Sequence, residues 1–375
     1  MHDFFLLYKA HLDARRGKTK KIDVLSFEMN LAQNLCKLQK ELLDKTYHPM
    51  PYFHFMVFEP KARSIHAPDY ADRVVQHCLC DNIIMPALEK RLIFDNAACR
   101  IGKGTHFSIR RLTSFLRDFY KNQGTSGYFL KCDIKKYFEN INHEVLKTKL
   151  SKVFEGDMFD LLCKIINSYE NTIQYSPPYQ GGLGGATQKE WRRHSPPYQG
   201  GTKGGGYYNS DGTGLPLGNQ TSQWFALYYL DEIDRFIKEI LKIKYYVRYM
   251  DDFVLLHHNK EYLKYCLSEI KWIIKYKLKL SLNKKTQIFP VKNGVDYLGW
   301  HFYMTETGKV ILKLKSTVKG RLKSRIRLLQ KEYRKRIIDY KKVKMCISSI
   351  NGHLIHGHTY KFRERLNDKM VFSRG

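Results

Sequence analysis

The chain has 375 residues, and 65 Lys and Arg residues against 36 Asp and Glu residues give it a formal charge of +29 at pH 7. Solubility does not require so large a positive charge, so the composition predicts a polyanionic partner. No run of about 18 apolar residues is present to span a bilayer, and the first residues lack the pattern of a secretory signal. We therefore expect a cytoplasmic protein with no membrane partner. Its eight cysteines are scattered without zinc-site spacing, which indicates reduced thiols.

The first hundred residues predict packing helices around a short strand-like region. Between residues 24 and 44, apolar side chains three or four positions apart form one stripe, which predicts a single packing helix. Phe53 to Phe58 is aromatic and strand-like, and the basic turn from Glu59 to Arg63 leads into a second strand-like segment. From Val74 to Leu88 the pattern is again apolar and helical.

Two later segments place acidic residues at the ends of strands. Residues 127–133 predict a buried strand that ends on Asp133, and residues 245–256 predict a hairpin whose apolar strands flank Asp251 and Asp252. Adjacent carboxylates repel each other, so a fold that keeps them together favours a hard divalent cation such as Mg²⁺. The alternative is an ordinary exposed Asp-Asp turn. Asp133 can reach the pair only through tertiary folding.

Residues 176–214 are rich in glycine and contain a repeat. The heptapeptide Ser-Pro-Pro-Tyr-Gln-Gly-Gly occurs at 176–182 and again at 195–201. Such a composition cannot form a packed core, which favours a flexible loop inserted between ordered elements. The rival interpretation is that its aromatic and basic residues contact nucleic acid or a partner.

The rest of the chain predicts helices, the last of them strongly basic. Residues 214–223 predict a turn that runs into an amphipathic helix, which extends through Phe225 to Ile237. Between Lys313 and Lys344, basic residues alternate with apolar positions at helical spacing, which predicts a basic amphipathic helix or helix pair. A membrane-surface helix and a solvated face are the alternatives, and the charge of the whole chain favours nucleic-acid phosphates. We interpret His353, His356 and His358 as structural.

Taken in order, these segments resemble the motif series of reverse transcriptases, from about residue 45 to about residue 360. The resemblance implies an α+β fold of the right-hand polymerase type, in which the palm combines an antiparallel sheet with helices. The implied divisions are an N-terminal helical extension (1–45), fingers (46–126), a palm (127–304) that carries the 176–214 insertion, and a basic helical thumb (305–375).

The resemblance also assigns roles to the acidic residues. Asp133, Asp251 and Asp252 match the catalytic carboxylates of the family, and together with the backbone carbonyl of Ile134 they would hold two Mg²⁺ ions, for which Mn²⁺ is a possible substitute. In the family one ion activates the primer 3′ hydroxyl and the other stabilises the departing pyrophosphate. Asp133 and Asp251 would bridge the ions, and Asp252 would support them electrostatically.

Further positions match the family's nucleotide-binding and primer-binding motifs. Lys61 and Arg63 match residues that reach the triphosphate, and Phe138 matches an aromatic gate that excludes a 2′ hydroxyl. The remaining matches are Arg73, Leu217, Gly218, Gln223 and Lys285 for the nucleotide, and Leu298, Gly299 and Trp300 for the primer grip.

The residues around Leu217 are most similar to the enzymes of diversity-generating retroelements. Many family members carry Gln-Gly followed by Ser-Pro here, whereas this chain has Leu217-Gly218 followed by Ser222-Gln223. Further likeness lies at residues 58–61, 72–80, 99–106 and 351–353. This resemblance implies an RNA-directed DNA polymerase that copies template RNA into cDNA from dNTPs and a primer, with frequent errors opposite adenine. The cDNA then replaces part of a target gene by mutagenic retrohoming, and an accessory protein is an expected partner.

Three alternatives stay open on the sequence. A phage-defence reverse transcriptase would share the same motifs. A retron or group II intron enzyme is disfavoured, because no maturase extension or endonuclease follows the expected thumb. An RNA-binding scaffold with a silent polymerase site is disfavoured by the intact Asp133, Asp251 and Asp252. Leu217 itself either loosens the geometry of the nascent base pair, because a Gln there could hydrogen-bond and Leu cannot, or merely packs.

Overall fold

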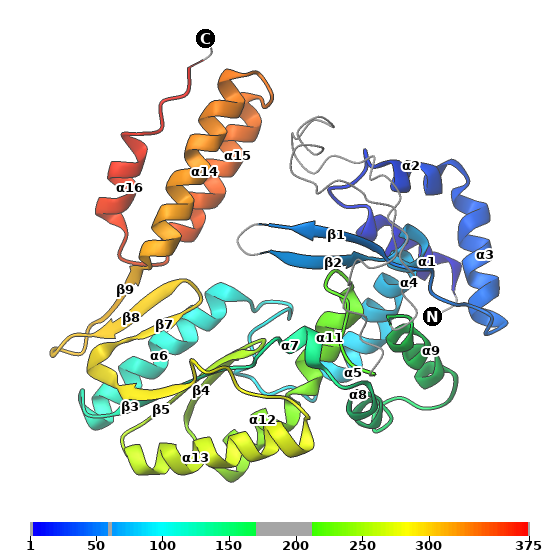
Figure 1. Cartoon of the computed structure of the whole chain (residues 1–375). Coiled ribbons are helices and arrows are strands. Elements are labelled where there is room, and N and C mark those ends of the chain that lie inside the picture. The colour runs from blue at the N-terminus through cyan, green and yellow to red at the C-terminus, as the bar shows by residue number, and fades with distance from the viewer. Residues whose placement is uncertain (1–2, 59–61, 170–211, 374–375) are drawn as a thin grey trace, which may run out of the picture. The chain divides into compact units, whose positions relative to one another are not determined.

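The computed structural model describes residues 3–58, 62–169 and 212–373 (Figure 1). Lys61 and most of the predicted 176–214 insertion lie outside the described residues. The chain folds into two units, each made of three segments. Unit 1 comprises Met1–Phe94, Ile134–Phe236 and Glu269–Asn283, and unit 2 comprises Asp95–Asp133, Ile237–Ser268 and Lys284–Gly375. None of the described helices is long and apolar enough to cross a membrane.

Unit 1 is mainly helical. Its N-terminal core gathers apolar residues of the first helices around Leu7, Leu35, Tyr70 and Val74, all at most 2% exposed. The elements wholly within unit 1 are α1 (Phe4–Ala14), α2 (Ile22–Met29), α3 (Leu31–Leu43), β1 (Phe53–Val57), β2 (Arg63–Ala67), α4 (Tyr70–Leu79), η1 (Cys80–Ile84), α5 (Met85–Glu89), α7 (Tyr137–Asn140), α8 (His143–Leu150), α9 (Gly156–Asn167), α11 (Gln220–Tyr229), α12 (Asp231–Arg235) and η3 (Ile273–Lys277). The elements η2 (Phe236–Ile240) and α13 (Lys260–Trp272) contribute residues to both units.

Two helices predicted as continuous are interrupted. The stripe at residues 24–44 lies on α2 and α3, which are separated at Asn30, where φ is −126° and ψ is 42°. The segment predicted as one amphipathic helix up to Ile237 is helical but not continuous, because it breaks at Leu230 between α11 and α12. Eight of the ten residues of α11 are buried, so most of the surface of this helix is enclosed and its predicted amphipathic character is not observed. Periodicity reported the helical type correctly and the boundaries incorrectly.

The strand-like segments on either side of the predicted basic turn form a hairpin. β1 pairs antiparallel with β2, with Phe53 opposite Ala67 and Val57 opposite Arg63. His66 on β2 donates its backbone N–H to the carbonyl of Leu217 at 3.2 Å. The hairpin is therefore attached to the turn that precedes α11.

The central sheet of unit 2 has four antiparallel strands in the order β4-β5-β3-β6. Its strands are β3 (Tyr128–Asp133), β4 (Tyr245–Tyr249), β5 (Asp252–His257) and β6 (Gln287–Pro290). The predicted strand at 127–133 and the predicted hairpin at 245–256 are both confirmed. Four of the five residues of β4 and four of the six of β5 are buried, which explains why these strands are continuous apolar runs rather than alternating ones.

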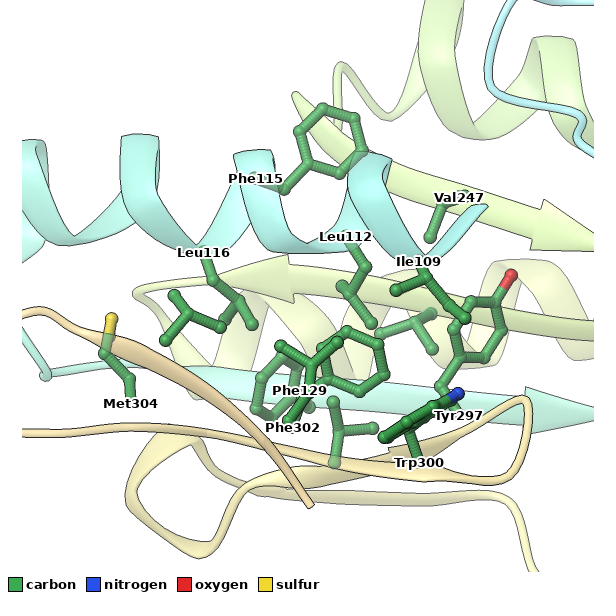
Figure 2. Close-up of a cluster of buried hydrophobic side chains, with 14 of the residues drawn as sticks. Ile109, Leu112, Phe115, Leu116, Phe129, Val247, Tyr297, Trp300, Phe302 and Met304 are labelled. Atoms are coloured by element: carbon green, nitrogen blue, oxygen red, sulfur yellow. The ribbon is translucent and has the colours of Figure 1, made fainter. Parts of the chain in front are cut away.

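A second sheet and a long helix complete the core of unit 2. β7 (Val295–Tyr297), β8 (Trp300–Met304) and β9 (Val310–Leu314) form an antiparallel meander, and α6 (Thr105–Gln123) contacts both β4 and β9. Figure 2 shows Leu112 and Leu116 of α6 directed toward Phe129 and Phe302. Apolar side chains four positions apart share one side of the helix, and this side packs against the strands.

Unit 2 ends in three helices, α14 (Ser316–Arg334), α15 (Tyr340–Leu354) and α16 (Tyr360–Asn367). The predicted basic helix pair corresponds to α14 and α15, whereas Lys313 and Leu314 belong to strand β9. Ile326, Leu354 and Leu366 carry the apolar sides of these helices into the unit 2 core. The basic residues lie on the remaining, solvent-exposed sides. The predicted boundaries between fingers, palm and thumb stay a proposal.

Candidate active site

Strand pairing brings the three predicted carboxylates to one edge of the central sheet. Asp133, the last residue of β3, is the Cα partner of Asp252, the first residue of β5. Asp252 is also paired with Tyr249 of β4, so that Met250 and Asp251 form the turn between the two strands. Asp133 and Asp252, 119 positions apart in sequence, therefore meet because β3 and β5 are neighbours in this register. All three side chains are partly exposed.

Asp252 lies in an electrostatically unfavourable place. Its side chain is 26% exposed, and burial raises its pKa to about 6, an effect that Asp133 and Asp251 reinforce and Lys131 opposes. The Lys131 ammonium lies 3.5 Å from Asp252 Oδ2, and it also donates to the carbonyl of Asp296. Within the described part of the chain, Asp252 Oδ1 is buried without a hydrogen-bond donor. This edge of the sheet thus concentrates negative charge that Lys131 does not fully compensate.

The carboxylates fit a divalent cation in chemistry. All the donors are oxygens, which hard cations such as Mg²⁺ prefer, and the buried, unpaired Oδ1 of Asp252 would gain a ligand. Among the described residues, however, no group of three or more His, Cys, Asp or Glu side chains is arranged as a metal site. Ile134, the fourth predicted ligand, is buried and forms a β-bridge with Leu282.

The turn between β4 and β5 contains a strained residue, and a buried arginine stabilises it by a hydrogen bond. Met250 has φ of +55°, a left-handed conformation that costs a residue with a side chain about 1–2 kcal/mol. Arg248, which is 0% exposed, donates from Nη1 to the Met250 carbonyl at 2.9 Å. The backbone of Arg248 is itself fixed, because its N–H donates to the Asp95 carbonyl and its carbonyl accepts from Ala97. The turn is therefore anchored to a second chain segment.

Sequence reasoning missed Lys131 and Arg248, although a signal existed for each. Lys131 stands two residues before Asp133, so both side chains project from the same face of β3. Arg248 is the one charged residue inside the apolar strand β4. A buried guanidinium needs acceptors, and the carbonyls of an adjacent turn are the nearest source of them.

The predicted nucleotide-binding residues of unit 1 fall into two groups. Leu217 and Gly218 lie against β2: Gly218 has φ of +134°, and a Cβ there would lie 3.1 Å from the His66 carbonyl oxygen. Phe138 is half-buried and lies next to this turn, because its backbone carbonyl accepts a hydrogen bond from the backbone N–H of Leu215 at 2.8 Å. The structure therefore brings the Leu217 turn together with both the β1-β2 hairpin and the start of α7.

The other nucleotide-binding candidates are placed as follows. Arg63 is exposed at the start of β2, and Gln223 is exposed on α11. Arg73 is engaged within unit 1, because Nη1 lies 3.2 Å from Asp23 and Nε donates to the Pro68 carbonyl. Lys285 is an exposed residue of unit 2, two positions before β6. Their predicted roles stay proposals.

The predicted primer grip is the turn of the β7-β8 hairpin. Tyr297 pairs with Trp300, and the two residues between them, Leu298 and Gly299, have φ of +48° and +87°. Positive φ at both positions defines the type I′ geometry that suits the twist of two-residue hairpins. Trp300 is 0% exposed within the core, where its ring lies 5.4 Å from that of His353. Trp300 therefore supports the turn, and Leu298 and Gly299 form its tip.

Comparison with known proteins identifies the family. The family described as "Reverse transcriptase (RNA-dependent DNA polymerase)" matches residues 59–302. This match covers more than half of the chain and spans the three carboxylates, so the protein belongs to the reverse transcriptase family. The expected α+β fold of the right-hand polymerase class is thereby confirmed.

Individual relatives are distant. The group II intron-encoded protein LtrA of Lactococcus lactis subsp. cremoris is 23% identical over 268 residues, which cover 69% of this chain and 38% of that protein. Among solved structures, truncated apo telomerase from Candida tropicalis has a TM-score of 0.46 at 14% identity, over 74% of this chain and 59% of the other. Telomerase from Candida albicans, in complex with a fragment of telomeric RNA, has a TM-score of 0.45 at 13% identity, over 76% and 52%. The chain thus spans only part of each relative.

Proposed function

We propose that the protein is an RNA-directed DNA polymerase that extends a primer with dNTPs on an RNA template. The observation that carries the proposal is the register of β3 and β5, which sets Asp133 opposite Asp252 beside the Asp251 turn in a chain of the reverse transcriptase family. Family membership by itself indicates use of divalent metal ions. Two Mg²⁺ ions, with Mn²⁺ as a substitute, are our proposal for this chain.

Asp133, Asp251 and Asp252 would hold these ions, together with the carbonyl of Ile134. When bound, the ions would supply Lewis acidity for in-line nucleotidyl transfer. Lys131 would keep Asp252 ionised, because its ammonium favours the charged form of that carboxyl against burial. The anchored Met250 turn would hold Asp251 and Asp252 in one position relative to Asp133, which proximity effects require.

The test is primer extension with purified full-length protein, an RNA template, a DNA primer, dNTPs and Mg²⁺. We expect Asp251→Ala with Asp252→Ala to abolish incorporation, because two of the three carboxylates are lost. The matched control is Asp157→Ala with Asp160→Ala, two exposed acids on α9. Extension by the first double variant at the wild-type rate would refute the assignment.

We further propose that the enzyme is of the diversity-generating type, copying its template with errors opposite adenine and working with an accessory protein. The support is Leu217, whose carbonyl is held by His66 and whose side chain is half-exposed. A Gln at this position could hydrogen-bond near the nascent base pair, and Leu cannot. The neighbouring Gly218 has a positive φ that residues with a side chain rarely adopt. We therefore expect the turn to keep its backbone conformation when the residue at position 217 is changed.

Leu217→Gln tests this second proposal. It replaces an apolar side chain with a hydrogen-bonding one of comparable size, and we expect it to lower misincorporation opposite template adenine while leaving misincorporation opposite the other template bases unchanged. Sequencing the cDNA made by both proteins on one template measures the effect. Identical error spectra would rule out a fidelity role for Leu217. A template and variable repeat beside the gene, with a small accessory gene, would support the diversification role.

A further inference from the structure

Unit 2 contains a basic hollow that has no part in the proposed chemistry. It has a volume of about 590 Å³ and lies between α6 and the start of β4. Its lining residues are Arg111, Ser114, Phe115, Arg117, Asp118, Lys121, Lys238, Lys244 and Tyr245. We call it the α6 basic pocket. It is lined by five cationic side chains and one carboxylate.

The pocket lies at the end of β4 that is remote from the catalytic turn. Tyr245 begins β4 at the pocket, and Tyr249 ends the strand beside Met250. Four residue steps of about 3.4 Å separate them, which places the two sites about 14 Å apart along the strand. A ligand in the pocket would therefore not contact the carboxylates directly.

Carboxylates order some of the cations without neutralising the pocket. Arg111 and Lys238 share buried Asp95, which lies 3.6 Å from the Lys238 ammonium. The Lys244 ammonium lies 2.8 Å from Asp118, which also accepts from the Tyr245 hydroxyl at 2.9 Å. Two carboxylates thus face five cations, which leaves three positive charges in excess. A dense cationic pocket of this kind attracts phosphate groups.

The two remaining cations are available to a ligand. Arg117 and Lys121 are exposed and lie four positions apart on α6, so they project from the same side of the helix. In the described part of the chain neither side chain forms an ion pair. The Arg111 guanidinium lies over the Phe115 ring, 4.3 Å from its centroid, a cation–π contact that favours this position of the Arg111 side chain. Phe115 is 7% and Tyr245 9% exposed, which leaves no aromatic face for bases to stack on.

We propose that the α6 basic pocket binds backbone phosphates of RNA, at a point outside the segment that is copied at the catalytic turn. The proposal rests on the proposed polymerase function for its choice of RNA. Phosphate contact without base stacking gives affinity and orientation but no sequence preference. The pocket would therefore hold the body of a long RNA while a remote part of the same molecule occupies the active site.

The test compares RNA binding and primer extension in the same full-length variant. We would measure binding of a fluorescein-labelled RNA hairpin with a single-stranded extension, over a range of salt concentrations, to wild type and to Arg117→Gln with Lys121→Gln. Loss of two phosphate contacts lowers the log–log salt slope by about 1.4 and weakens binding about tenfold near physiological salt. Lys264→Gln with Lys271→Gln, two exposed lysines on α13, is the matched control.

Primer extension on a short RNA–DNA duplex separates this proposal from the polymerase function. We expect the Arg117/Lys121 variant to extend that duplex at the wild-type rate, because neither side chain lies at the catalytic turn and the short duplex lacks the long RNA body that the pocket would hold. An unchanged salt slope, or an equal loss in the α13 control, would overturn the proposal. So would a variant that binds the RNA normally but loses affinity for polyglutamate, which would indicate an acidic protein partner instead. An inactive wild type that still showed the pocket-dependent slope would overturn only the polymerase function.

Discussion

Replacing Arg248 should release the turn that carries Asp251 and Asp252. The left-handed conformation of Met250 costs about 1–2 kcal/mol, and a hydrogen bond from a charged donor contributes about 1.5–3 kcal/mol. The 2.9 Å bond from Arg248 to the Met250 carbonyl is therefore large enough to offset the strain. Without it, other conformations of the turn become accessible, and the fraction in the catalytic one falls.

We expect Arg248→Met to lower the rate of single-nucleotide incorporation by roughly 10- to 100-fold, since each 1.4 kcal/mol is a factor of ten. Methionine fills most of the same buried volume and removes only the donors, which makes it a better choice than alanine. The dNTP concentration for half-maximal rate should change little, because Arg248 is buried and does not face solvent. Rapid-quench assays at saturating dNTP provide the measurement, with exposed Arg16→Met as the control.

A double-mutant cycle with Met250→Gly tests whether the Arg248 hydrogen bond offsets the strain at Met250. Glycine adopts positive φ without penalty, so the strain that Arg248 offsets is absent in its background. The loss caused by Arg248→Met should then be smaller by about 1 kcal/mol, or about fivefold in rate. Strictly additive effects, or a folded Arg248→Met protein within twofold of wild type, would show that the bond does not position the turn.

Two further predictions concern stability. Burial raises the pKa of Asp72 to about 6 from 3.8, so the folded state binds this proton more tightly than the unfolded state does. The free energy of unfolding should therefore fall by up to about 3 kcal/mol as the pH rises from about 4 to about 6. Asp72→Asn should remove this pH dependence in urea unfolding, and an identical pH profile would contradict it. Gly299→Ala should destabilise by about 1–2 kcal/mol, because φ is +87° while the nearest atom to a Cβ is 3.5 Å away. Gly320→Ala, in a helix with open space, should instead stabilise by about 0.5–1 kcal/mol, and equal effects of the two changes would argue against backbone strain.

Much of the site could be predicted from local sequence, because each of its strands is marked by its own short apolar run. The segments that end on Asp133 and flank Asp251 are apolar runs bounded by acids, and β3, β4 and β5 form within one residue of the predicted ranges. Helix boundaries were less predictable. The stripe across Phe27 and Leu31 continues in register through Asn30, although the backbone breaks there. The spacing of apolar side chains indicates which side of a helix is buried. It does not reveal a break in the backbone when the same side stays buried before and after the break.

The sequence by itself determined the charge of the chain, the strands that carry the catalytic acids and the three acids that characterise its family. Only the tertiary structure decided that Asp133 lies opposite Asp252, that Lys131 faces this pair, and that Arg248 supports the Met250 turn. It also assembled the α6 basic pocket from residues of α6, η2 and β4. The physical reason is that strand registers and buried polar contacts depend on residues far apart in the chain. Local propensity carries no information about which distant partner a strand or a charged side chain will meet.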